Sequence, residues 1–324
     1  MKSSFSENIL STLVYYDIFD YPLTSFELWK YLTVPGGDVT ETEKCSLGEI
    51  IQALDSEDIK KNVEEFRGFY FLKGRRTLVA RRIQNDKNSI AKFKTAGRVA
   101  WWLRLVPFVR MIAVTGTLAM KNPEQNSDID FFVVLGKGRI FTGRLLVTAM
   151  VHLLGKRRHG KKIKNRVCLN YFITIGSLEI QRQDLFAANE YSFIYPLFGF
   201  NFFQRFCKAN LNWIKKFKPN WEAPEIEPAK YYREHGKMSR LIQKTKETLI
   251  NFLGGDIMEA WLKSKQIAWI EKNPLTHRAG AYIEATDKNL IFLPEPQGVK
   301  IYGEYHKRRN KLTPSELVYD ESFS

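Results

Sequence analysis

The stretch from Met111 to Leu135, MIAVTGTLAMKNPEQNSDIDFFVVL, constrains the fold more than any other part of the sequence. An apolar run stands at each of its ends, and short apolar runs bounded by turn residues are typical of buried strands. Because successive side chains of a strand point to opposite faces, Asp128 and Asp130 are expected to share one face while Ile129 points into the core. The sequence therefore predicts two buried strands, the second of which begins with a pair of acids.

Two neighbouring carboxylates repel each other unless a cation lies between them. Mg²⁺ suits this position, because it takes oxygen ligands and is usually held by one or two carboxylates together with substrate phosphates. A pair of such ions roughly 4 Å apart would bind the attacking and leaving oxygens of an in-line phosphoryl transfer. Gly116 lets the backbone approach a phosphate, and Thr117 opens a short helix whose free N–H groups attract anions. Asp128 and Asp130 are thus the candidate catalytic and metal-binding residues of a site for a metal-bound triphosphate.

This stretch resembles the signature of the polymerase-β-like nucleotidyltransferase superfamily, in which Gly-Ser or Gly-Gly follows an apolar strand and Asp-x-Asp or Asp-x-Glu begins the next. Here the motif consists of Gly116-Thr117, ten residues, and Asp128-Ile129-Asp130. The resemblance is specific over this stretch and looser over residues 100–215. It implies an α+β core of a short mixed sheet with helices, two Mg²⁺ ions, a nucleoside triphosphate as substrate, and Ser127 among the nucleotide-binding residues.

The third strand of such a core is predicted at Val167–Ile175. The superfamily normally places a third carboxylate there, which helps to hold the metal or takes the proton from the acceptor hydroxyl. At the corresponding position this chain has Asn170, an amide that can coordinate a metal but cannot act as a base. Glu179, Asp184 and Glu190 lie downstream and could supply a carboxylate from a helix. Either two carboxylates suffice, or the domain binds a nucleotide without transferring it.

Positive charge is concentrated after the acidic strand. The segment from Gly136 to Arg166 contains ten Lys and Arg residues and no acid, and the whole chain has a formal charge of +15. Arg139 and Arg144 are predicted to reach the outer phosphates of the nucleotide. The loop Lys156–Arg166 is dense enough to bind a long polyanion such as RNA, although a solvated basic loop would have the same composition.

Residues 1–86 combine helical periodicity with strand-like runs in an order that resembles a winged helix. Two capping boxes, at Thr24 and Ser46, mark helix starts. The next helix is predicted at Ser56–Arg67, closed by Gly68, and a hairpin is expected to join Phe69–Leu72 to a strand at residues 77–80. As a recognition helix, residues 56–67 would carry a net charge of about −1, too little positive charge for DNA phosphates. A docking or substrate-presenting role is therefore preferred to sequence-specific DNA binding.

The remaining boundaries follow from composition. Residues 87–218 are predicted to form the nucleotidyltransferase core and residues 219–324 a linker and C-terminal helical region. Three prolines within Pro219–Pro228 mark the linker. A basic helical pair follows at Tyr231–Leu253 and Ile257–Ile270, to which a role in shaping the acceptor pocket is given by analogy. The polar end from Pro294 onward is predicted to be an extended or loosely held tail.

The three cysteines, Cys45, Cys168 and Cys207, form no Cys-x-x-Cys pair. They suggest neither a zinc site nor a disulfide framework, so a reducing cytoplasm is the expected location. No signal-peptide core and no run of about 18 apolar residues is present, so no membrane partner is expected.

These observations favour a cytoplasmic Mg²⁺-dependent enzyme that transfers a nucleoside monophosphate from a nucleoside triphosphate to an acceptor hydroxyl. The acceptor stays open among RNA, a protein and a small molecule, with the positive charge favouring RNA. The alternative, suggested by Asn170, is a catalytically degenerate regulator that binds nucleotides or nucleic acid and carries a winged helix.

Overall fold

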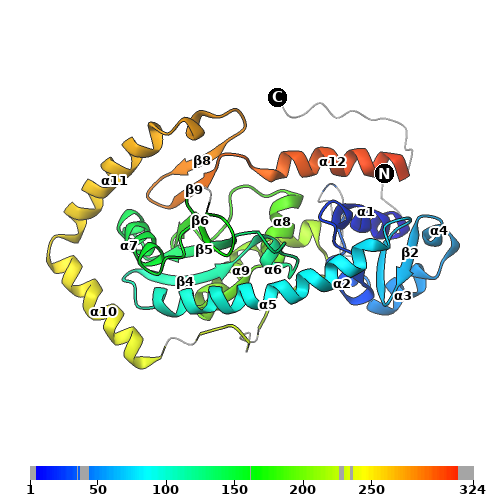
Figure 1. Ribbon diagram of the computed structural model, residues 1–324, viewed down its shortest axis with the longest axis horizontal. Helices are drawn as coiled ribbons and strands as arrows, with labels where there is room; N and C mark the ends of the chain where they lie inside the picture. The colour runs from blue at the N-terminus through cyan, green and yellow to red at the C-terminus, as the bar shows by residue number, and fades with distance from the viewer. Residues whose placement is uncertain are drawn as a thin grey trace. The chain divides into compact units, whose positions relative to one another are not determined.

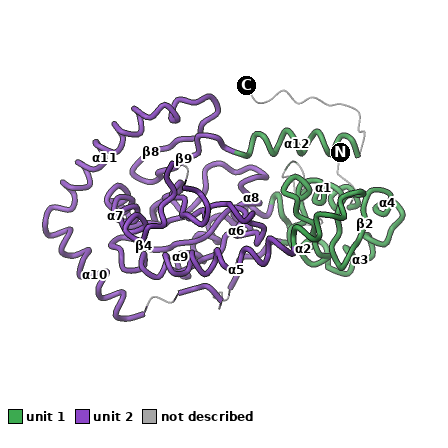
Figure 2. Tube along the Cα trace, viewed as in Figure 1, with its two compact units in different colours: residues 1–82, 216–220, 297–324 green, residues 83–215, 221–296 purple. Residues whose placement is uncertain are grey.

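The computed structural model describes residues 5–34, 36, 44–160, 162–225, 230–233 and 236–312. The chain forms two compact units (Figure 2): Met1–Arg82, Lys216–Asn220 and Gln297–Ser324 make up unit 1, and Ile83–Lys215 and Trp221–Pro296 make up unit 2. These boundaries differ from the predicted 1–86, 87–218 and 219–324, because residues 221–296 belong to the same unit as the central core. The architecture is α+β, as the sequence predicts, with helices and mixed sheets.

Unit 2 is built on a six-stranded mixed sheet with the order β7-β4-β5-β6-β9-β8 (Figure 1). Strands β5 and β6 are parallel, and the other neighbours are antiparallel. The three strands predicted from the sequence are present as β4, β5 and β6, while β8 and β9 come from the region predicted to be helical. The strands are β4 Val109–Val114, β5 Ile129–Leu135, β6 Val167–Thr174, β7 Tyr195–Phe198, β8 Tyr282–Ala285 and β9 Asn289–Leu293.

Helices connect most of these strands along the chain. The predicted helical pair is present as α10 and α11, with a turn at Gly254 between them. Among the helices of the described residues, none is both long enough and apolar enough to cross a lipid bilayer. The helices of unit 2 are α5 Thr77–Leu103, whose first turn belongs to unit 1, α6 Gly116–Ala119, α7 Ile140–Leu153, α8 Leu185–Ser192, α9 Phe200–Phe217, α10 Lys237–Phe252 and α11 Gly255–Glu271.

Strand β5 has two buried faces of different composition. Its odd-numbered residues, beginning with Ile129, join a cluster with residues of α5 and α7. Its even-numbered Phe132 instead packs against Tyr171 on β6, Tyr191 on α8 and Phe206 on α9, with ring centroids 5.1–5.9 Å apart. The period of two along a strand therefore places Asp130 on the face that α8 and α9 cover.

Unit 1 contains a three-stranded sheet with the order β1-β3-β2. Both predicted capping boxes are confirmed: Thr24 pairs reciprocally with Glu27, and Ser46 with Glu49. The elements of this unit are α1 Phe5–Asp17, β1 Leu23–Thr24, α2 Ser25–Lys30, α3 Leu47–Leu54, α4 Glu57–Lys60, β2 Val63–Phe66, β3 Phe69–Leu72 and α12 Gln297–Leu312.

The predicted helix over residues 56–67 is wrong. Helix α4 ends at Lys60, and residues 63–66 form β2, which pairs with β3 in an antiparallel hairpin. Arg67 and Gly68 connect the two strands with φ of +56° and +78°. Two consecutive positive φ values are typical of a type I′ hairpin turn, so Gly68 serves the hairpin and not a helix C-cap.

The predicted strand over residues 77–80 is also wrong, because this segment opens the 27-residue helix α5. Buried residues recur at helical spacing from Leu78 to Leu103. Several of them are polar, among them Arg82, Asn85 and Lys92. A hydrophobic pattern therefore could not reveal the continuous buried stripe.

The short segment Lys216–Asn220 is held in unit 1 by a fully buried lysine. The ammonium group of Lys218 donates to the Tyr16 hydroxyl at 3.1 Å and to the Tyr31 carbonyl and Thr33 hydroxyl at 3.3 Å. Burial lowers the pKa of Lys218 to about 7. This position therefore balances three hydrogen bonds against the desolvation of a charge.

The C-terminal segment is not the extended tail that was predicted from residue 294. Residues 297–312 form α12, whose Tyr305 is buried against the Tyr15 ring of α1. Residues 313–324 lie outside the described residues, as do residues 226–229 of the predicted linker and residue 161 of the basic loop.

Candidate metal and nucleotide site

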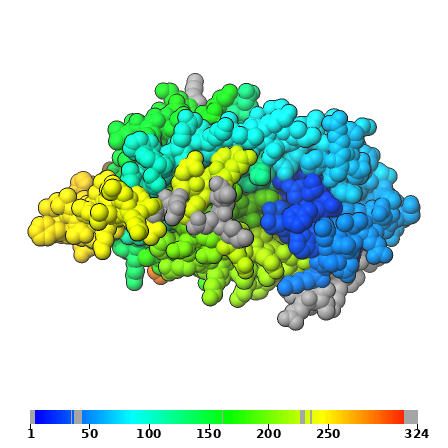
Figure 3. Space-filling model, turned by 90° about the horizontal axis from the view of Figure 1, so that it is seen from below, coloured from blue at the N-terminus to red at the C-terminus, as the bar shows by residue number. Residues whose placement is uncertain are grey.

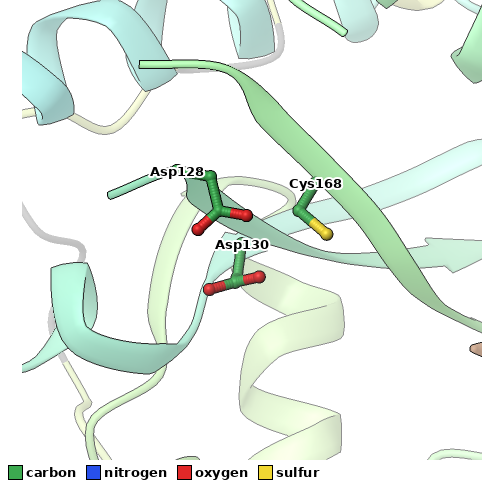
Figure 4. Close-up of side chains that lie close together, drawn as sticks. All are labelled: Asp128, Asp130 and Cys168. Atoms are coloured by element: carbon green, nitrogen blue, oxygen red, sulfur yellow. The ribbon is translucent and has the colours of Figure 1, made fainter. Parts of the chain in front are cut away.

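The two acids of the motif and a cysteine converge at the start of β5. Asp128 immediately precedes the strand, Asp130 is its second residue, and Cys168 lies beside Asp130 on β6. One ligand atom of each lies within 4.8 Å of the others. Figure 4 shows the three side chains close together, with the carboxyl groups of Asp128 and Asp130 next to each other. Ile129, between the acids, is fully buried in the opposite face, as predicted.

The third-strand residue beside the acids is Cys168 and not Asn170, the residue predicted for this position. The register pairs Asp130 with Cys168 and then shifts, so that Phe132 pairs with Tyr171. The irregularity inserts one extra residue into β6, and Asn170 falls within it. Such an insertion changes which side chain faces the neighbouring strand, and counting along the sequence cannot anticipate it.

Gly116 lies directly against Asp130. Its φ is +65°, and a Cβ built on it would lie 2.9 Å from the Asp130 Oδ2. Both the backbone conformation and the lack of space require glycine at this position. The glycine turn and the acids therefore meet in space, as the motif spacing predicts. Thr117, the next residue, is exposed.

A third carboxylate reaches the turn from α8. The partly buried Glu190 accepts a hydrogen bond from the Gly116 N–H at 2.7 Å and one from the Thr115 side chain. Burial raises the pKa of Glu190. The N–H of Gly116 is therefore taken by Glu190, contrary to the expectation that the N–H groups of this turn are free for a phosphate.

Glu179 and Asp184, the other two downstream carboxylates, have different partners. Asp184 caps α8 by accepting from the Ala187 N–H at 2.8 Å, and it pairs with Arg182. Glu179 accepts from Gln183 at 3.1 Å. Of the three downstream candidates, only Glu190 contacts the glycine turn.

Negative charge is crowded at this place. The pKa of Asp130 is raised to about 7 by burial and by the nearby Asp128 and Glu190, against opposing effects of Arg158 and Cys168. Burial and the two aspartates raise the pKa of the Cys168 thiol to about 12. Near neutral pH the thiol is therefore a neutral group, and a cation would relieve the mutual repulsion of the carboxylates.

One arginine of the basic loop reaches this cluster. Arg158 donates to the Asp128 Oδ2 at 2.5 Å and lies 3.6 Å from the Cys168 Sγ. Its backbone N–H donates to the Val167 carbonyl at 2.9 Å, which holds the loop along the start of β6. The Arg158 side chain is 43% exposed, so the pair with Asp128 is accessible to solvent.

The structure does not bring Arg139 and Arg144 to the acids. Both come after Leu135, the last residue of β5. At ~3.3 Å per residue, the strand from Asp130 to Leu135 is about 17 Å long. Arg139 donates to Asn251 and pairs with Asp256. Arg144 donates to Gln266 at 2.6 Å and lies over the Phe292 ring. Both arginines therefore bind the C-terminal helices and strand of unit 2.

A buried lysine that the sequence analysis did not single out holds the acidic loop. Lys92 of α5 donates to the carbonyls of Gln125 and Ser127, at 3.3 and 2.6 Å, and to the Asn165 side chain at 2.9 Å. Ser127, predicted to bind nucleotide, instead turns its hydroxyl to the Glu124 carbonyl. Lys92 is only 2% exposed and fixes the backbone directly before Asp128.

Comparisons of the chain with family models, with curated proteins and with solved structures found no match.

Proposed function

We propose that unit 2 is a polymerase-β-like nucleotidyltransferase core that transfers a nucleoside monophosphate from a nucleoside triphosphate to an acceptor hydroxyl. The observation that carries the proposal is the contact between Gly116 and Asp130, which unites the two halves of the motif across thirteen residues. Strand order adds support, because the two acids lie at the start of β5, a central strand of a mixed sheet.

The donor set fits Mg²⁺. Asp128 and Asp130 offer oxygen ligands within reach of one another, and Glu190 adds a third carboxylate nearby. Hard cations prefer such oxygens to a protonated thiol, so Cys168 would lie beside the ion without binding it. When bound, Mg²⁺ would neutralise charge on the triphosphate and on the attacking and leaving oxygens.

Three further residues would bind the phosphates or position the site. Arg158 takes the phosphate-binding role that the sequence analysis gave to Arg139 and Arg144, because it is the arginine that reaches the acids. Glu190 holds the Gly116 turn in place. Lys92 fixes the loop before Asp128. The reaction would form a bond between the acceptor oxygen and the α-phosphorus and break the bond from that phosphorus to the oxygen bridging to the β-phosphate. Pyrophosphate would leave, and the hydroxyl proton would pass to solvent water.

We propose that unit 1 is a winged-helix-like domain, in which helices α1 to α4 precede the β2–β3 hairpin along the chain and the sheet has the order β1-β3-β2. In that architecture α3, and not residues 56–67, would occupy the position of the recognition helix. The only charged residue of α3 is Glu49. A docking or substrate-presenting role for this unit is therefore proposed in place of sequence-specific DNA binding.

RNA is the acceptor class that the charge favours, through the formal +15 of the chain and the basic loop that carries Arg158. The test is incubation of the full chain with α-labelled nucleoside triphosphates, Mg²⁺ and total cellular RNA. Asp130→Asn should abolish the transfer of label, while Asp287→Asn, a change at an exposed ion pair with Lys263, should preserve it.

The second candidate is a nucleotide- or nucleic-acid-binding regulator without transferase activity. The cysteine at the third-strand position favours it, because a neutral thiol cannot act as a metal-binding carboxylate or as a base. Tight, salt-sensitive nucleic-acid binding with no label on RNA, protein or small molecules would decide for this function and against the enzyme.

A further inference from the structure

Helix α10 presents polar residues to the core and apolar residues to solvent. Gln243 donates to the carbonyls of Val106 and Val109, both at 2.8 Å. Glu247 binds the Arg110 guanidinium through two contacts, at 2.7 and 2.9 Å. This polarity is the reverse of that of an ordinary surface helix, whose apolar stripe faces the core.

The outward side of this helix and the start of α11 form a continuous apolar surface, which we call the apolar tip. Its five side chains are between 56% and 86% exposed. On α10, the exposed apolar residues fall within an arc of about 100° at the helical period of 3.6 residues; they are Met238, Leu241, Ile242, Leu249 and Phe252. The apolar tip consists of Leu249, Phe252, Leu253, Ile257 and Trp261.

The turn between the two helices carries the apolar tip outward. Gly254 has a φ of +90°, which lets α10 end and α11 begin without an intervening loop. Figure 3 shows the yellow segment that contains α10 as a projection from the rest of unit 2. Large side chains at a protruding turn, exposed together, indicate a surface that another phase or molecule covers.

Charge is segregated around the apolar tip. Lys237, Arg240 and Lys244 of α10 are exposed on the flank beside the apolar arc, and we call them the basic flank. Two acids of the same hairpin turn inward, since Glu247 binds Arg110 and Glu259 accepts from the N–H groups at the start of α7 at 2.9 Å. Asp256, at the start of α11, is exposed and pairs with Arg139. The solvent side of α10 is therefore cationic and apolar.

We propose that the apolar tip and the basic flank bind the surface of an anionic lipid bilayer. An apolar helix face with Phe, Leu and Trp, next to a Lys- and Arg-rich polar face, is the combination that lies in the headgroup region of a membrane. A nucleic acid would satisfy the basic flank but leave the five apolar side chains in water. Protein interfaces are depleted in lysine, which supplies two of the three cations here.

This surface binding needs no membrane-spanning helix, since the 16-residue α10 would lie in the interface plane, and none was found within the part of the chain that the structure describes. It departs from the expectation of no membrane partner, which rested on the length of apolar runs alone. The proposal is independent of the nucleotidyltransferase activity. The apolar tip lies next to Arg139, which comes after the end of β5 that is opposite to the acids.

Co-sedimentation of the full chain with vesicles tests the proposal. One set of vesicles contains phosphatidylcholine and phosphatidylglycerol in equal parts, and the other contains phosphatidylcholine alone. We expect salt-sensitive binding to the anionic vesicles, at least tenfold stronger than to the neutral ones. The triple variant Phe252→Ser, Leu253→Ser, Ile257→Ser should weaken it at least tenfold, and so should Lys237→Ser, Arg240→Ser, Lys244→Ser.

A control is Phe26→Ser with Ile51→Ser, which removes two apolar side chains of unit 1 that are 52% and 46% exposed. This control should bind the anionic vesicles as the unchanged chain does. Absence of vesicle binding would overturn the proposal. A dimer in light scattering that the apolar-tip variant dissociates, without vesicle binding, would assign the surface to a second copy of the chain and overturn it too.

Discussion

Replacing Gly116 by alanine tests the contact on which the proposed function rests. The added Cβ would lie 2.9 Å from the Asp130 Oδ2, closer than such atoms normally approach, so the carboxylate must move by a few tenths of an ångström. The positive φ adds a backbone cost of about 1 kcal/mol. Because the carboxylate is a proposed metal ligand, its displacement should reduce transfer about 10- to 100-fold, or ~1.4–2.7 kcal/mol in the activation barrier.

Gly138 provides the matched control. It has a similar φ of +70°, but a Cβ built there meets no atom within 4 Å. Gly138→Ala should therefore lower the free energy of unfolding about as much as Gly116→Ala, by about 1 kcal/mol, and leave the site intact. Urea unfolding measures the stability of both variants, and label transfer with Mn²⁺ affinity by electron paramagnetic resonance measures the site.

Full Mn²⁺ affinity and full transfer in Gly116→Ala would refute the reasoning, because the carboxylate would then not need its observed position. Equal losses in Gly116→Ala and Gly138→Ala would also refute it, since the backbone cost alone would explain them.

Three further predictions concern buried charges. The raised pKa of Asp130 means that the metal-free folded state binds a proton that the unfolded state releases, so stability should fall as the pH rises from about 4 to about 7. Asp130→Asn should flatten that fall in urea unfolding across pH; an unchanged slope would contradict the assignment. The lowered pKa of Lys218 has the opposite sign, so stability should rise between about pH 7 and pH 10, and Lys218→Met should remove the rise in thermal unfolding at several pH values. Lys92→Met leaves three acceptors without their donor and should cost roughly 2–4 kcal/mol, whereas Lys94→Met, at an exposed position of the same helix, should cost less than about 0.5 kcal/mol.

Local patterns in the sequence located the centre of the site. The spacing of Gly116, Asp128 and Asp130 and the apolar runs around them were sufficient to predict β4, β5 and the meeting of the turn with the acids. Both capping boxes could also be predicted from the sequence, because a capping box involves residues only three positions apart.

Features that depend on contacts between distant residues could not be predicted in the same way. The choice between a helix and a strand for residues 63–66 was decided by pairing with β3, which overrode the apparent helical period. The long helix α5 was interrupted in the prediction because its buried stripe contains Arg82, Asn85 and Lys92. Such residues are buried only where tertiary partners satisfy their hydrogen bonds.

The same division holds within the site. The sequence by itself determined the acid pair and its glycine, since strand alternation and backbone conformation act over a few residues. Only the tertiary structure selected Glu190, Arg158 and Cys168 as their neighbours and moved Arg139 and Arg144 to other partners. These contacts join residues 30 to 74 positions apart or depend on a shift of strand register, and the packing of the whole sheet and its helices decides them.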